Sequence, residues 1–160
     1  EIYTLSLHDA LPIFGAVELR SDGRRAGLLR QVLDTGAVRR VILDIVAPAR
    51  LYPAVAGGGL DMQDLEQSIT LVKGHAEHMI RMLVTAWPGE EGTLTRLAPA
   101  EAGEAAKMVL DACGDRMLPV FIEAQPVEGL EALEDQALLP YRSKIRMSLV
   151  KAEIRKPDAR

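Results

Sequence analysis

Cysteine and aromatic residues are scarce in this 160-residue sequence. Its single cysteine, Cys113, excludes an internal disulfide and any CxxC metal or redox pair. Phe, Tyr and Trp make up only 4% of the chain, so the core has to be built mainly from aliphatic residues and Met. No apolar run approaches the ~20 residues that a membrane-spanning helix needs. These absences predict a soluble protein of the reducing cytoplasm that makes no membrane contact.

The first thirteen residues, EIYTLSLHDALPI, are expected to be foreign to the protein. They can be encoded by the end of a common short-read sequencing adapter, whose final base also fits the first base of the Phe14 codon. A secretory signal is excluded, because the stretch has no basic start, no long apolar run and no small-residue cleavage site. We therefore predict that residues 1–13 are a translated adapter and that residues 14–160 form one globular domain. Whether a native N-terminal part is missing stays open.

Charge is unevenly distributed along the chain. The thirteen adapter residues contain Glu1 and Asp9 but no Lys or Arg, so the net charge without them is −2 instead of −4. Acidic residues dominate the segment 89–140, whereas basic residues dominate 141–160. The two segments are therefore expected to pair with each other or to face different partners.

Apolar periodicity and turn residues predict a helix-rich α+β domain with a small sheet. We expect strands at 15–20, 38–46 and 118–123, and these form the sheet. Helices are expected at 26–34, at 130–139, and from Pro99 to Gly114. The stretch 141–155 fits helical spacing and strand alternation equally well.

The strongest pattern in the chain is a series of apolar residues spaced three and four apart. It predicts one long amphipathic helix of about 25 residues, from the N-cap Asp61 to the stop at Pro88 and Gly89. Two interpretations follow: a helix packed on its own domain, which is favoured, or a seam for self-association. Gly74 in the middle disfavours a free-standing coiled coil. The apolar stripe of this helix, the candidate interaction surface, is Met62, Leu65, Ile69, Val72, Ala76, Met79 and Leu83.

A basic stripe near the C-terminus is the second candidate surface, because lysine and arginine at this density can contact phosphates. A solvated face, or one paired with the preceding acidic segment, is the favoured interpretation. A nucleic-acid partner is the less favoured alternative. The residues of the stripe are Arg142, Lys144, Arg146, Lys151, Arg155 and Lys156.

Motifs for a metal, a cofactor or catalysis are weak. His75 and His78 are three residues apart, but two ligands are too few for a metal site and no third lies at helical spacing. The glycines at 57–59 lack the spacing and the lysine of a phosphate-binding loop. Cys113 lies among carboxylates, which do not activate a thiol. We therefore expect no metal and no cofactor.

The sequence thus predicts an interaction or assembly domain without recognisable catalytic residues, acting as a homo-oligomer or with a protein partner. One alternative is a nucleic-acid-associated protein that uses the basic C-terminal segment. The other is a fragment of an enzyme whose N-terminal part is missing.

Overall fold

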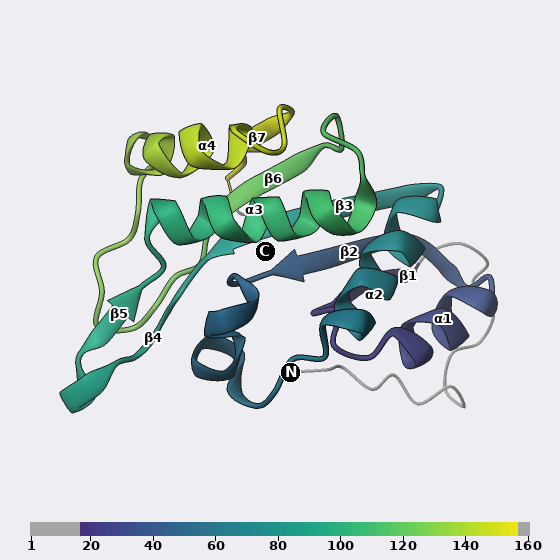
Figure 1. Cartoon of the computed structure of the whole chain (residues 1–160), viewed down its shortest axis with the longest axis horizontal. Coiled ribbons are helices and arrows are strands. Elements are labelled where there is room, and N and C mark those ends of the chain that lie inside the picture. Colours follow the sequence, from purple (N-terminus) through teal and green to yellow (C-terminus); the bar gives the residue numbers. More distant parts are fainter. Residues whose placement is uncertain (1–16, 157–160) are drawn as a thin grey trace.

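Five parallel strands form the main sheet of the protein (Figure 1). The computed structural model describes residues 17–156, and the predicted adapter, residues 1–13, lies outside this range. Each strand pairs with the next one in the sheet, and their spatial order is their order in the sequence. They are β1 (Val17–Ser21), β2 (Val38–Ile45), β3 (Glu77–Val84), β6 (Val120–Ala124) and β7 (Ala152–Ile154).

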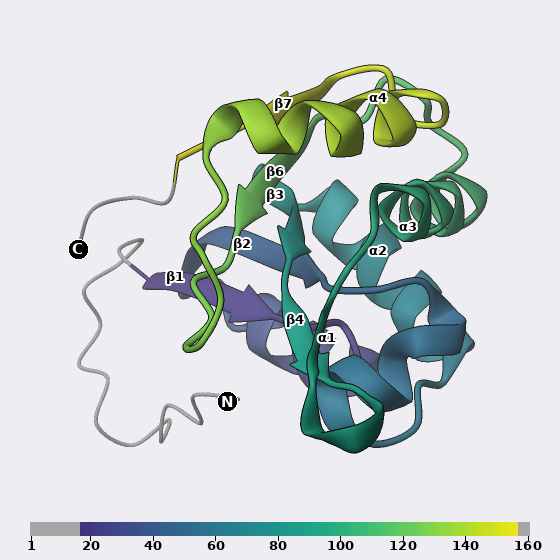
Figure 2. The ribbon, with the colours of Figure 1, turned by 90° about the vertical axis from the view of Figure 1, so that its left-hand side faces the viewer.

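The four α-helices in the described part of the chain lie on one face of this sheet. Each helix connects two neighbouring strands, and each of the first three contacts the helix that follows it. Figure 2 shows the helices in an arc around the sheet. Right-handed crossovers between sequential parallel strands always place the helices on the same side, which explains the arrangement. The helices are α1 (Ala26–Asp34), α2 (Met62–Gly74), α3 (Pro99–Cys113) and α4 (Leu139–Arg146).

The two faces of the sheet differ in composition. Side chains that point toward the helices are apolar and form the core, with Leu43, Ile80, Val120 and Ala152 all fully buried. The opposite face carries no helix within residues 17–156, and we call it the helix-free face. It mixes charged and apolar side chains. By strand alternation and register its members are Glu18, Arg20, Arg40, Ile42, Asp44, Glu77, Met79, Arg81, Leu83, Phe121, Glu123 and Glu153.

Local signals at the start of α2 and at both ends of α3 agree with the sequence prediction. The Asp61 side chain caps α2 by accepting a hydrogen bond from the backbone N–H of Gln63 at 2.9 Å. Pro99 opens α3, and the Glu101 carboxylate accepts from the backbone N–H of Ala98 at 2.8 Å. Gly114 ends α3 in the left-handed conformation, at φ 66°.

The long helix is the main correction to the sequence prediction. The helix ends at Gly74, His75 is already extended, and β3 begins at Glu77. Met79 and Leu83 are four residues apart, a spacing that fits one helix face and also alternate residues of a strand. Pairing decides the outcome, because β3 is hydrogen-bonded to β2 on one side and to β6 on the other. Only the stripe from Met62 to Val72 is helical.

The C-terminal part of the chain also differs from the prediction. The acidic helix expected at 130–139 is replaced by a 3₁₀ turn, Asp135–Leu138, that leads into α4. Pro140 does not end a helix but lies in the first turn of α4, where its missing N–H needs no partner. The undecided stretch 141–155 contains both structures, since α4 is followed by β7.

The connections at the two ends of the sheet differ in length. At the amino ends of the strands, short turns at 35–37, 75–76 and 147–151 link helix to strand. At the carboxyl ends the connections after β2, β3 and β6 are longer and have structure of their own. They contain the helical turns Ala49–Leu51 and Pro53–Gly57, the antiparallel hairpin of β4 (Ala86–Pro88) and β5 (Leu94–Arg96) with the turn Glu90–Gly92, and the turn at 135–138.

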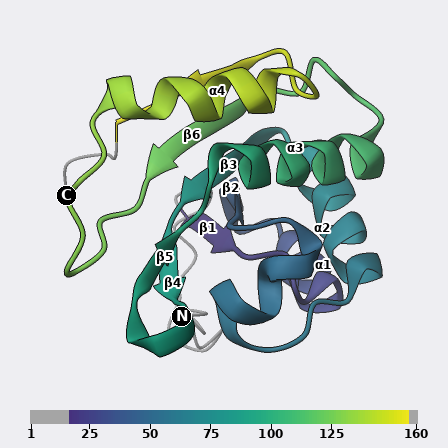
Figure 3. The ribbon, with the colours of Figure 1, turned by 60° about the vertical axis from the view of Figure 1, so that its left-hand side comes forward.

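The mixed helix-and-sheet class predicted from the sequence is confirmed. The sheet is larger than expected, since β3 and β7 join the three predicted strands. Within residues 17–156, no helix has the length and apolarity needed to cross a bilayer. Figure 3 shows the resulting layers, with the helices covering one side of the sheet and the hairpin of β4 and β5 projecting beyond the strand ends.

Candidate site at the carboxyl ends of the strands

Three charged side chains meet on the helix-free face, on the adjacent strands β2, β3 and β6. The Arg81 guanidinium donates two hydrogen bonds to the Asp44 carboxylate, both at 2.7 Å, and a third to Glu123 at 3.0 Å. The side chains of Arg81, Asp44 and Glu123 are 11%, 18% and 8% exposed. We call these three residues the Arg81 cluster. It fixes the relative positions of three strands with charge-assisted bonds.

The Arg81 cluster carries one negative charge in excess, because one guanidinium faces two carboxylates. Burial lowers the pKa of Arg81, but the hydrogen bond and charge of Asp44 and those of Glu123 raise it. The balance leaves the pKa above its ordinary value. The guanidinium is therefore charged at every pH at which the protein folds, and its two partners depend on it for compensation.

Apolar and cationic groups continue the helix-free face beside this cluster. Phe121 is the register partner of Arg81, and the Arg155 guanidinium lies 5.8 Å from the centre of its ring. Such a position over an aromatic face is favourable for a cation. Arg155 also lies 3.4 Å from the Sδ atom of Met79. Eight of the twelve side chains assigned to the helix-free face are charged and four are apolar, unlike the aliphatic core face.

Arg24 links the connection after β1 to the connection after β2 through hydrogen bonds. Arg24 donates from Nε to Asp22 at 2.7 Å and from its terminal nitrogen to the carbonyls of Ala56 and Gly57, at 3.3 and 2.8 Å. Arg24 therefore fastens the segment 53–57 to the turn after β1. This anchoring holds the connection after β2 over the ends of β1 and β2.

Tyr52 lies beneath that connection and is fully buried. Its hydroxyl group lies beside the backbone of Val46 but makes no hydrogen bond of good geometry within residues 17–156. Burial raises the pKa of Tyr52 to about 12, so the hydroxyl is neutral at physiological pH. The Tyr52 side chain therefore stabilises the fold through the packing of its ring and contributes little through hydrogen bonding.

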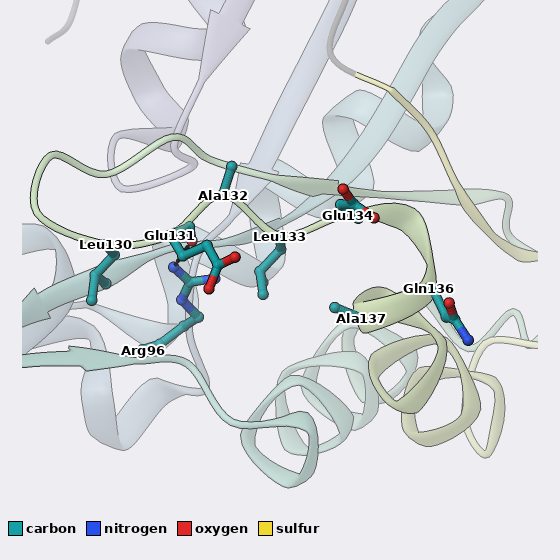
Figure 4. Close-up of a pocket in the computed structure, with 8 residues that line it drawn as sticks. All are labelled: Arg96, Leu130, Glu131, Ala132, Leu133, Glu134, Gln136 and Ala137. Carbon is teal, nitrogen blue, oxygen red and sulfur yellow. Dashed lines mark hydrogen bonds between the residues drawn. The ribbon is translucent and has the colours of Figure 1, made fainter.

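The connection after β6 forms a shallow, open depression against β5 (Figure 4). Arg96 donates a hydrogen bond at 2.7 Å to the backbone carbonyl of Glu131, and the side chains of Leu130 and Leu133 lie around it. The other residues that line the depression are Ala132, Glu134, Gln136 and Ala137. It has one charged donor, which is already hydrogen-bonded, and its openness leaves a ligand largely in water. We do not assign a site to it.

The predicted interaction stripe does not form one surface. Leu65, Ile69 and Val72 on α2 are fully buried against the core of the same chain, and Met62 is half-buried. Ala76 is exposed in the turn before β3. Met79 and Leu83 lie on the helix-free face, on the opposite side of the sheet from α2. The helical part of the stripe is therefore core.

The predicted basic stripe is also divided. Arg142, Lys144 and Arg146 belong to α4, where Arg146 donates to the carbonyl of Ala152 at 2.9 Å. Arg155 lies over Phe121, Lys156 is 4.0 Å from Asp135, and Lys151 is exposed in the turn before β7. The pairing of Lys156 with Asp135 joins the basic end to the acidic segment.

The two histidines bind backbone groups instead of converging. The Nε2 atom of His75 lies 3.1 Å from the carbonyl oxygen of Arg39, and the Nδ1 atom of His78 lies 2.7 Å from that of His75. In the part of the chain that the structure describes, no group of three or more His, Cys, Asp or Glu side chains could hold a metal ion.

The Arg81 cluster was missed at the sequence level, although a signal exists. Asp44 interrupts the run VILDIV, Arg81 the run MIRML, and Glu123 the run VFIEA. A lone charge inside an apolar strand marks a position that faces a second environment or a buried partner. The three positions become one site only when the strands are placed side by side. No protein-family model matches this sequence, and none of the characterised proteins compared with it is detectably similar.

Proposed function

We propose that this protein is an assembly domain that associates with a second copy of itself through the helix-free face of its sheet. One observation carries the proposal: the four helices that the structure describes between residues 17 and 156 cover the same face of a five-stranded parallel sheet. Parallel sheets are found almost exclusively with both faces covered, since their strands bury side chains on each side. A second protein body is the simplest cover for the other face.

The composition of the helix-free face supports a contact with a like surface. Arginines and carboxylates alternate across it, as in the pairs of Arg20 with Glu18 and of Arg40 with Glu18 and Glu77. Apolar groups such as Phe121 and Met79 lie between them. A surface with nearly balanced charge can face its own copy across a two-fold axis, because each positive group has a negative counterpart available.

Sedimentation equilibrium of the full chain tests the proposal. We expect a mass near twice 17.4 kDa that falls toward the monomer on dilution. Phe121→Glu, on the helix-free face, should favour the monomer. Leu94→Glu is the matched control, because it places the same charge on the projecting hairpin, at a side chain that is 37% exposed. A folded wild-type chain that stays monomeric at every concentration would refute the proposal.

Ligand binding at the carboxyl ends of the strands is a second candidate, and it corresponds to the enzyme-fragment alternative. The observation that favours it is the position of the long connections and the Arg81 cluster at that end of the sheet. In parallel α/β proteins, ligands bind where the carboxyl ends of the strands meet their loops. A thermal-shift screen of small metabolites tests it. A metabolite that raises the melting temperature has to lose this effect in Asp22→Asn, because Asp22 lies in the connection at the carboxyl end of β1. The effect has to be retained in Asp34→Asn, a change in the last turn of α1.

A further inference from the structure

The two edge strands of the sheet have different neighbours but the same direction. Among residues 17–156, β1 pairs with β2 alone and β7 with β6 alone. All the pairings in the sheet are parallel, so β1 and β7 run in the same sense. An edge strand presents unpaired N–H and C=O groups to its surroundings. The β7 edge of one copy could therefore continue, in parallel register, into the β1 edge of another.

Four of the six exposed large hydrophobic side chains among residues 17–156 lie on elements next to these edges. The other two, Leu94 and Met117, lie on β5 and in the turn before β6. Leu28 lies on α1, the helix that connects β1 with β2, and is 42% exposed. Leu139 begins α4, while Met147 and Val150 lie between α4 and β7 and are 71% and 44% exposed. The middle helices, α2 and α3, have no exposed large hydrophobic side chain. Exposed apolar groups concentrated on terminal elements indicate a contact surface there.

We propose that two copies join edge to edge, with β7 of each copy beside β1 of the other, so that the sheets close into one parallel barrel. This inference rests on the proposed function and specifies its geometry. The two-fold axis then runs along the strands, which keeps every strand parallel. Closure covers the helix-free faces and pairs both edges in one step, and a barrel is the arrangement that removes edges altogether.

Exposed charged side chains lie at both edges on the helix-free face. Strand β7 carries Glu153, whereas β1 carries Arg20 and Glu18, which are 3.4 Å apart. At each junction Glu153 of one copy can thus pair with Arg20 of the other in place of Glu18. The closed barrel also brings both Arg81 clusters to one shared interior and the long connections of both copies to one end. A ligand site at the carboxyl ends would then include residues from two chains.

Cysteine cross-linking between two single variants tests this geometry. Arg20→Cys and Glu153→Cys are prepared separately in a Cys113→Ser background, which removes the only native thiol. A bismaleimide of about 10 Å reach spans roughly two strand spacings, so it can join the two cysteines across the junction between neighbouring strands. We expect covalent dimers when the two variants are mixed and allowed to exchange subunits, and at least fivefold less product from either variant alone.

The outcomes separate the inference from the proposed function. A dimer by sedimentation in which Arg20→Cys cross-links with itself would show β1 beside β1, which overturns edge-to-edge closure but keeps self-association. A dimer with no mixed product would overturn the closure in the same way. A wild-type chain that is monomeric by mass would overturn both. Folding of each variant is checked by circular dichroism, and the exposed Lys107→Cys variant on α3 serves as a second control position that should give no mixed product with Arg20→Cys.

Discussion

Replacement of Arg81 by methionine tests the electrostatic account of the helix-free face. Methionine keeps much of the length of the side chain but leaves the carboxylates of Asp44 and Glu123 without their shared partner. All three side chains are less than one-fifth exposed, so water compensates for the lost partner only in part. Removing one member of a buried ion pair costs about 3–5 kcal/mol. The lower end applies here because of the residual exposure, so we expect a loss of about 3 kcal/mol.

Urea unfolding followed by circular dichroism measures this loss as a change in the free energy of unfolding. Arg39→Met is the matched control, because Arg39 contacts Glu77 at 3.3 Å with a side chain that is 58% exposed. A surface pair of that kind is worth between 0 and about 1 kcal/mol. Adding Asp44→Asn and Glu123→Gln to Arg81→Met should recover most of the lost free energy of unfolding, since no buried charge then lacks a partner. If Arg81→Met costs no more than Arg39→Met, the reasoning is refuted.

Three further predictions concern single positions. Tyr141→Phe should destabilise the protein by about 1 kcal/mol in urea unfolding, because the buried Tyr141 hydroxyl donates a hydrogen bond to the carbonyl of Leu97 at 2.6 Å. Tyr52→Phe should change the free energy of unfolding by less than about 0.5 kcal/mol. Equal losses in the two variants would contradict this prediction. The pKa of Tyr52 is raised to about 12, above the ordinary value of 10, so its contribution is complete below pH 10 and is lost as the pH rises toward 12. A pH titration of stability should therefore show a steeper alkaline loss in wild type than in Tyr52→Phe, and identical slopes would argue against it. Gly27→Ala, on α1, should raise stability by about 0.5–1 kcal/mol, because no atom lies near the added methyl group. Gly103→Ala should lower stability, because its methyl group would lie 3.2 Å from Cβ of Lys144 on α4. Thermal unfolding in which both variants shift in the same direction would contradict this account of the packing around the two glycines.

The parts of the fold that the sequence predicts well are those with a local cause. The bounds of α1 and the ends of α3 are predicted because Gly36, Pro99 and Gly114 act on their own neighbours. The strand β2 is predicted because its apolar run needs burial on both sides, and Val41 and Ile42 are indeed buried on opposite faces.

The parts that the sequence does not predict depend on distant partners. The segment 77–84 has a spacing compatible with helix and strand, and only pairing with β2 and β6 makes it a strand. The Arg81 cluster needs side chains from three strands that are far apart in the sequence. The hairpin of β4 and β5 is short, and its two strands are held by each other and by the burial of Trp87.

Amide hydrogen exchange of the wild-type chain, compared at high and low protein concentration, tests the central claim most directly. If two copies cover the helix-free face and pair at their edges, exchange in β1 and β7 should be slower at high concentration. Exchange in α2 and α3 should not depend on concentration, since those helices already pack on their own sheet. Slower exchange confined to the helices, or no concentration dependence where sedimentation shows a dimer, would contradict the account.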